Sequence, residues 1–165
     1  MEKEYYLLSY RLNQKDGYLI WYSDETDGLL TDESGKVISF NSKQQLLEFA
    51  FNINITIQPD EPEFHNMDLV NEWIKENDPM LINFSAFNGI WNLWTDIANS
   101  TGRSFYQDKV STDEIYDKLF WSCELPTANP EDRRYYPEWT ERELITMKEL
   151  FSGGMAMFQE TLVTY

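Results

Sequence analysis

The sequence is poor in the residues that most often build enzyme sites and redox frameworks. Its 165 residues include one cysteine and one histidine. Cys123 therefore cannot form an internal disulfide, and its apolar setting in FWSCEL indicates a buried thiol rather than a nucleophile. His65 alone is too little for a histidine-rich metal site. These shortages favour a reducing compartment and argue against cysteine or histidine chemistry.

The motifs of nucleophilic and nucleotide chemistry are also missing. There is no G-x-S-x-G, no Walker glycine-lysine loop and no G-x-G-x-x-G. A calcium loop counted from Asp24 fails because its positions 3 and 6 would be Thr26 and Leu29. Carboxylate pairs at glycosidase spacing carry no weight, since a chain with 29 acidic residues produces such pairs by chance. We therefore expect no enzyme activity, no metal and no cofactor.

Long hydrophobic runs are absent as well. No window reaches the roughly 18 apolar residues of a membrane span, and the opening MEKEYYLLSY lacks the positive start and apolar core of a signal peptide. We expect a cytoplasmic protein that does not enter a membrane.

Basic residues are scarce relative to acidic ones. Lys and Arg total 13 and Asp and Glu total 29, which gives a net charge of −16. A field of that sign repels phosphate backbones and anionic membrane surfaces, so direct binding of nucleic acid is not expected. The same field accelerates the encounter with a strongly basic protein partner.

What the sequence does have is apolar and aromatic mass, with 42% hydrophobic and 16% aromatic residues, which is enough for a folded core. Residues 4–12, 17–24 and 36–40 have strand composition, and 29–31 make a short further strand. Turn residues at 15–17 and 33–35 separate them, which predicts an antiparallel β-meander. The alternation in INITI, residues 53–57, indicates another strand.

Helical signals occupy the rest of the chain. Ser42 with Gln45 predicts a helix over 42–51, and Thr140 with Glu143 forms a capping box that opens a late helix. Ser111 with Glu114 is a further capping box and predicts that another helix begins there. The spacing of apolar residues predicts further helices after residue 68 and over 87–98, where large aromatics at helical spacing are better explained as core than as a ligand pocket. Gly102 ends the second of these.

The predicted architecture is one α+β domain over residues 1–165. An N-terminal antiparallel β-meander with one inserted helix makes up a sheet-rich segment at 1–57, which is followed by a loop at 58–67 and a mainly helical half at 68–165. Gly153-Gly154 is expected to break or kink the last helix, after which the chain continues as helix or returns to the sheet.

Two acidic segments are the candidate partner-binding sites. SDETDGLLTDESG packs five carboxylates and no base into thirteen positions, and QPDEPEFHNM adds three more around two prolines. For either segment taken alone, a solvated acidic turn is the favoured interpretation, and the second segment with His65 is also a weak candidate for a metal loop. A third candidate is the proline-bounded stretch around RRYY, unless its tyrosines only cover the core and its arginines pair with nearby acids. The candidate residues are Asp24, Glu25, Asp27, Asp32, Glu33, Asp60, Glu61, Glu63, Arg133, Arg134, Tyr135 and Tyr136.

The acidic turns, the strand-to-helix passage DESGKVISFNSKQQLLEFA and the DEPEF loop make the chain similar to the small acidic immunity proteins of bacterial polymorphic toxin systems, including contact-dependent growth inhibition systems. The resemblance is one of type, in size, acidity and lack of catalytic motifs. It implies a cytoplasmic protein that binds and neutralises one cognate basic toxin, often a nuclease, with carboxylates taking the place of phosphates. A non-inhibitory adaptor and a metal- or ligand-binding enzyme domain stay as alternatives.

Overall fold

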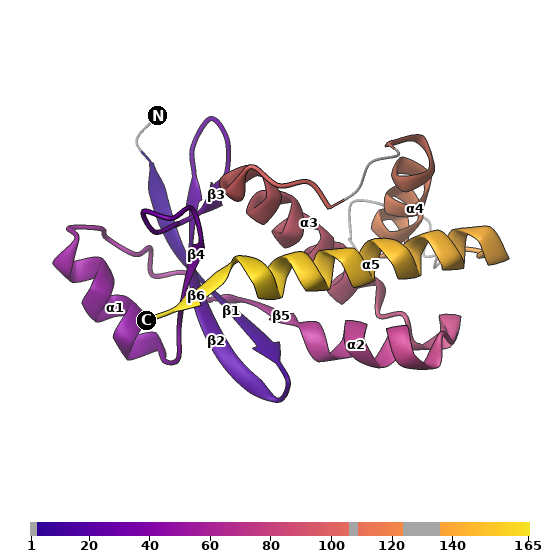
Figure 1. Cartoon of the computed structure of the whole chain (residues 1–165), viewed down its shortest axis with the longest axis horizontal. Coiled ribbons are helices and arrows are strands. Elements are labelled where there is room, and N and C mark those ends of the chain that lie inside the picture. The colour runs from indigo at the N-terminus through magenta and orange to yellow at the C-terminus, as the bar shows by residue number, and fades with distance from the viewer. Residues whose placement is uncertain (1–2, 106–108, 124–135) are drawn as a thin grey trace.

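A six-stranded mixed sheet lies at the centre of the fold, with helices on both faces (Figure 1). The computed structural model describes residues 3–105, 109–123 and 136–165, and of residues 109–111 the backbone alone. The elements in chain order are β1 (Glu4–Leu12), β2 (Lys15–Ser23), β3 (Gly28–Leu29), β4 (Val37–Phe40), α1 (Lys43–Asn52), β5 (Glu63–Asn66), α2 (Met67–Glu76), η1 (Pro79–Leu81), α3 (Phe84–Thr101), α4 (Lys109–Ser122), α5 (Glu141–Thr161) and β6 (Leu162–Thr164).

The strand order is β5-β1-β2-β4-β6, and β3 pairs with β2 beside β4. The pairs among β1, β2, β3 and β4 are antiparallel, which confirms the predicted α+β class with an N-terminal meander. Two strands from later in the chain complete the sheet, because β5 joins β1 and β6 joins β4, both in parallel.

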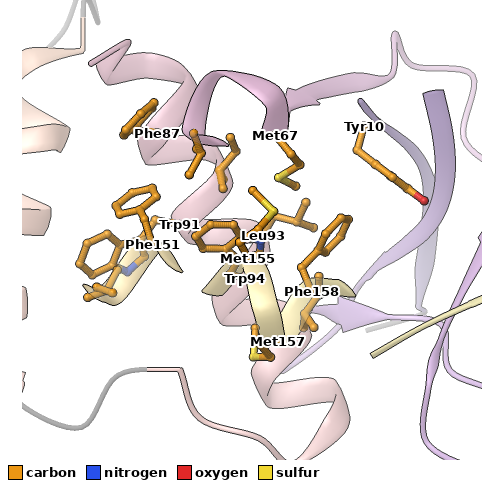
Figure 2. Close-up of a cluster of buried hydrophobic side chains, with 14 of the residues drawn as sticks. Tyr10, Met67, Phe87, Trp91, Leu93, Trp94, Phe151, Met155, Met157 and Phe158 are labelled. Carbon is orange, nitrogen blue, oxygen red and sulfur yellow. The ribbon is translucent and has the colours of Figure 1, made fainter. Parts of the chain in front are cut away.

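The side chains of the sheet alternate between two cores. Leu8, Tyr10 and Leu19 face the larger core, which they share with α2, α3, α4 and α5. Leu7 and Ile20 face a smaller core under α1. Figure 1 accordingly shows α1 on one side of the sheet and the other helices opposite it. Figure 2 shows how aromatic and methionine side chains of α3 and α5 meet in the larger core beside Tyr10 of β1.

The first hairpin turn lies two residues earlier than predicted. It consists of Asn13 and Gln14, which have φ angles of 53° and 61°, whereas Lys15 and Asp16 already belong to β2. Two successive positive φ angles give the twist that a tight hairpin needs, but glutamine is an unusual residue there. The Asp68 carboxylate supports the turn by accepting both backbone N–H groups at 2.7 and 2.8 Å.

The helix boundaries agree with most of the predicted signals. Ser42 caps α1 by accepting from the Gln45 N–H, and the capping box of Thr140 and Glu143 opens α5. Gly102 ends α3 with a φ of 67°. The start predicted at Ser111 is wrong, because α4 already includes Lys109.

The predicted break at Gly153-Gly154 is also wrong. Helix α5 runs unbroken from Glu141 to Thr161, and the chain then returns to the sheet as β6. Gly154 is buried, and the Trp94 ring of α3 occupies the space that a side chain at 154 would need. This glycine therefore serves close helix packing rather than helix termination.

Residues 53–67 differ most from the prediction. INITI is not a strand, because Ile53 caps the end of α1, Asn54 follows in a turn, and only Ile57 makes an isolated bridge, to Tyr5. The predicted loop at 58–67 instead contains β5, and α2 begins at its last residue. The two prolines at 59 and 62 hid this strand, because local sequence rules mark them as loop residues.

Within the ranges described, no helix has both the length and the apolar character needed to cross a membrane.

Candidate functional site

The free edge of β1 is covered by the chain from Ile57 to Asn66, with one interruption. Ile57 bridges to Tyr5, the Gln58 N–H donates to the Tyr5 carbonyl at 2.8 Å, and ladder pairing resumes where Glu63 lies opposite Leu8. Pro59 and Pro62 lie between these points and have no N–H to donate. In the ranges that the structure describes, no backbone hydrogen bond joins 59–62 to β1. The segment Pro59–Pro62 therefore arches away from the edge and carries Asp60 and Glu61 outward.

A depression of about 150 Å³ opens where the arch leaves the strand, and we call it the notch. On the sheet side it is bounded by Tyr6 and Trp21, which are cross-strand partners with ring centroids 5.4 Å apart. Both side chains are partly exposed. On the arch side it is bounded by acidic residues. Its lining residues are Tyr6, Leu7, Leu8, Trp21, Asp60, Glu61 and Glu63.

Asp96 of α3 adds a fourth carboxylate beside the notch. Its Oδ2 accepts a 2.9 Å hydrogen bond from the Trp21 indole Nε1–H, which fixes the orientation of the indole ring. Burial raises the pKa of Asp96, the hydrogen bond from Trp21 lowers it, and the charges of Asp27 and Glu63 raise it further. Carboxylates from the β2–β3 turn, β5 and α3 therefore act on one another across this corner of the molecule.

The field of the acidic arch also reaches the tyrosine. The Tyr6 hydroxyl donates a 3.0 Å hydrogen bond to Glu4. The pKa of Tyr6 is raised, first by that hydrogen bond and then by burial, with smaller contributions from the charges of Glu4 and Asp60. The aromatic pair thus lies in a negative potential to which Glu4 contributes from the same strand and Asp60 from the arch.

The acids of the β2–β3 turn have structural roles as well as charge. Asp27 accepts hydrogen bonds from the Ser23 hydroxyl and the Asp24 N–H, at 3.1 and 3.3 Å. Asp24 lies 3.8 Å from the Lys3 ammonium, which also lies over the Tyr22 ring. Glu25 is exposed at the tip. The turn is therefore partly neutralised on one side and leaves Glu25 and Asp27 outward.

Asp32 and Glu33 lie in a different turn, which leads to β4. Asp32 builds that turn by accepting from the Ser34 N–H, the Ser34 hydroxyl and the Lys36 N–H. The hydrogen bonds from Ser34 and Lys36 lower the pKa of Asp32. Neither Asp32 nor Glu33 lines the notch or is among the charges that act on Asp96. The acids at 24–27 therefore lie in the β2–β3 turn, and Asp32 and Glu33 lie in a separate turn before β4.

The other candidate residues have simpler surroundings. Arg133, Arg134 and Tyr135 lie outside the described residues, and Tyr136, just before α5, has 67% of its surface exposed.

His65 belongs to the packing between β5 and α3. Its side chain is buried, and its ring lies 3.5 Å from the position a Cβ would take at Gly89. Burial lowers the pKa of His65, and the nearby charge of Glu63 raises it less. Among the residues described, no group of three or more histidine, cysteine or acidic side chains has the arrangement of a metal site.

Cys123 is half-buried, and its thiol donates a 3.3 Å hydrogen bond to the Leu119 carbonyl. Burial raises its pKa, so the reactive thiolate is disfavoured.

Sequence reasoning identified the acids on the arch side of the notch and missed the aromatic pair on the sheet side. Tyr6 and Trp21 read as ordinary strand residues until the register places them opposite each other. The sequence could have indicated Asp96, because it is the one charged residue among the 18 of α3. A single acid in an otherwise uncharged helix that packs on a sheet indicates a specific partner, and here the partner is Trp21.

Comparison with known proteins gives one likeness at the level of the fold. No family model matches the chain, and no curated protein matches it. The crystal structure of the SatS C-terminal domain in complex with bromine superposes with a TM-score of 0.64 at 9% sequence identity. The match covers 99% of this chain and 94% of that one. At this identity the likeness concerns the fold alone.

Proposed function

We propose that this chain is an immunity protein that binds and neutralises a cognate basic toxin domain in the cytoplasm. The observation that carries the proposal is that charge from Asp27 of the β2–β3 turn and from the acidic segment 60–63 converges on Asp96 and the partly exposed pair Tyr6 and Trp21. Neither segment alone distinguishes a binding surface from a solvated one. Their convergence, with Asp96 between them, favours a surface that binds a protein of opposite charge.

The charge at this corner is only slightly compensated. Lys3 lies near Asp24, but among the ion pairs of the described residues none involves Glu25, Asp60 or Glu61. Keeping like charges close costs free energy that a basic partner recovers on binding. A toxin that grips phosphates would meet these carboxylates in their place.

Charge alone gives fast association rather than a durable complex. Slow dissociation comes from buried aromatic contacts at the centre of an interface, with polar groups around them. Tyr6 and Trp21 fit the first role, since they are partly exposed and held by hydrogen bonds to Glu4 and Asp96. The acids around them fit the second. The rigid sheet and α3 present both without a need for rearrangement.

A capture experiment in the native host tests the proposal. The tagged chain is incubated with lysate at low salt, washed with rising salt, and the retained proteins are identified by mass. We expect one basic protein that survives about 0.5 M salt, beyond the range of simple screened attraction. That protein, when expressed alone, should arrest growth, and co-expression of this chain should restore it.

The outcome that contradicts the proposal is equally defined. A diffuse set of proteins that elutes at modest salt would mean that the charge serves solubility. A single retained protein that is harmless when expressed would point to an adaptor rather than an inhibitor. The control bait carries Glu25→Lys in the β2–β3 turn and Glu61→Lys at the notch, two exposed positions, and should lose the partner.

A further inference from the structure

The notch has the shape and the chemistry to receive one side chain of a partner. Its volume of about 150 Å³ matches that of a cavity of about 150 Å³ that holds one benzene-sized group, which suits a single side chain. Two aromatic rings bound it on the sheet side, and Asp60, Glu61 and Glu63 bound it on the arch side.

We infer that the notch is a pocket for one arginine side chain of the basic partner, stacked against Tyr6 and Trp21 with its guanidinium toward the carboxylates of the arch. The inference rests on the proposed function in one respect, namely that the partner is a basic protein. It adds the residue type that the partner inserts and the place where that residue binds.

Arginine fits this site better than lysine for geometric reasons. A guanidinium is flat, stacks on aromatic faces and donates in a fork to more than one carboxylate oxygen. The notch offers two aromatic side chains on one side and carboxylates from two neighbouring stretches on the other, Asp60 and Glu61 in the arch and Glu63 at the start of β5. A lysine ammonium is a compact, strongly hydrated charge that gains less from a flat aromatic wall.

The pocket is already formed before a ligand arrives. The Trp21 ring is held by its hydrogen bond to Asp96, and the Tyr6 hydroxyl is held by Glu4. The arch is fixed at both ends, by the Gln58 hydrogen bond to Tyr5 and by the pairing of Glu63 opposite Leu8, with prolines limiting its backbone between them. An incoming side chain therefore orders little besides itself.

Indole NMR of the intact chain tests the inference without the toxin. The sequence has six tryptophans, so six indole N–H signals are expected, and Trp21→Phe assigns one of them. The probes are two blocked tripeptides, glycyl-arginyl-glycine and glycyl-lysyl-glycine, titrated at equal ionic strength. We expect the Trp21 signal to shift and saturate with the arginine peptide, at an affinity about five- to tenfold higher than with the lysine peptide. Equal responses, or no response of Trp21, would overturn the inference.

Variants locate the binding. Tyr6→Ala should abolish the arginine response while the indole signals of the buried Trp73 and Trp94 stay in place as a check on the fold. If that variant does not fold, Asp60→Asn with Glu61→Gln changes two exposed positions and should weaken binding severalfold. The matched control is Glu33→Gln with Glu48→Gln, two exposed acids elsewhere, which should leave the response unchanged. A full response in a folded notch variant would overturn the inference.

The two proposals fail separately. If the chain protects no cell from any toxin but the Trp21 signal still discriminates arginine from lysine, the inhibitor function is contradicted and the arginine pocket is supported. If a toxin is neutralised and the peptides do not shift the Trp21 indole signal, the arginine pocket is contradicted and the inhibitor function is supported.

Discussion

Gly154 of α5 packs directly on the indole of Trp94 of α3, and a Cβ at position 154 would overlap the ring atoms of that tryptophan. Its neighbour Gly153 is exposed, and a Cβ at position 153 would lie 3.9 Å from the Phe105 carbonyl oxygen. Two adjacent glycines in one continuous helix therefore have opposite environments.

This contrast predicts opposite effects of the same substitution. Gly154→Ala should destabilise the fold by about 1–3 kcal/mol, because the added methyl overpacks the contact with Trp94. Gly153→Ala should be neutral or stabilise it by up to about 1 kcal/mol, because alanine is the better helix former and the space is open. Urea unfolding of both variants measures the difference. Equal destabilisation by both would show that the glycines act through helix flexibility instead.

The first hairpin depends on a carboxylate from α2. Asp68 accepts the N–H groups of both turn residues, Asn13 and Gln14. Asp68→Ala should therefore cost about 1–3 kcal/mol, the range for lost hydrogen bonds to a charged group. The control is Asp16→Ala, which breaks the exposed ion pair with Arg11 in the same hairpin and should have a smaller effect on the unfolding midpoint. An effect of Asp68→Ala no larger than that of the control would contradict this role.

The raised pKa of Asp96 predicts how the stability of the fold changes with pH. Burial raises the pKa of this carboxyl in the folded chain, so the folded state holds its proton to higher pH than the unfolded state does. The stability from protonated Asp96 is complete below the ordinary aspartate pKa and is lost as pH rises through the raised value.

Asp96→Asn cannot ionise, so it avoids the loss of stability at higher pH, and its side-chain oxygen can still accept a hydrogen bond from the Trp21 indole. We expect the variant to be more stable than the parent chain at pH 7, with the difference shrinking as the pH falls through the raised pKa. Thermal unfolding across pH 3–8 measures it. A difference that grows toward acid pH would have the wrong sign for this account.

Association with the captured partner should depend on which acids are changed. Glu25→Lys with Glu61→Lys reverses two exposed charges, one in the β2–β3 turn and one at the notch, and should slow association about ten- to a hundredfold at low salt, with a flatter salt dependence. Glu33→Lys with Glu48→Lys changes the net charge equally and should slow it far less. Stopped-flow measurement over a salt series separates the two. Equal slowing would mean that net charge, rather than this corner, steers the encounter.

Local signals in the sequence predicted most of the secondary structure correctly. The capping box at Thr140 and the left-handed end at Gly102 are short-range features, and both are present. The errors involve partners distant in the chain. Gly154 looked like a helix breaker because Trp94, sixty residues earlier, is not visible from its neighbours.

The strand β5 was hidden for a related reason. Pro59 and Pro62 mark a loop by every local rule, and the loop is real, but it is a short arch between two points of pairing with β1. Parallel pairing across more than fifty residues leaves no local pattern in the sequence. The hairpin turn at Asn13 and Gln14 was displaced because its stability depends on Asp68, again a distant residue.

The same limit applies to the candidate site. Charge counting indicated the acids, since a run of carboxylates is visible in any short window. It could not show that Asp27 and Glu63 act on the same carboxyl of Asp96, or that Asp32 is occupied in its own turn. It also could not find Tyr6 and Trp21 as a pair, because that requires the strand register.

Protection of toxin-producing cells tests the central claim most directly. Cells that express the captured partner receive the parent chain, a variant with Tyr6→Ala and Glu61→Lys, or the control with Glu33→Lys and Glu48→Lys, all at matched levels of folded protein. We predict that the parent chain and the control restore growth and that the notch variant does not. Full protection by a folded notch variant would contradict the claim that this corner of the molecule binds and neutralises the toxin.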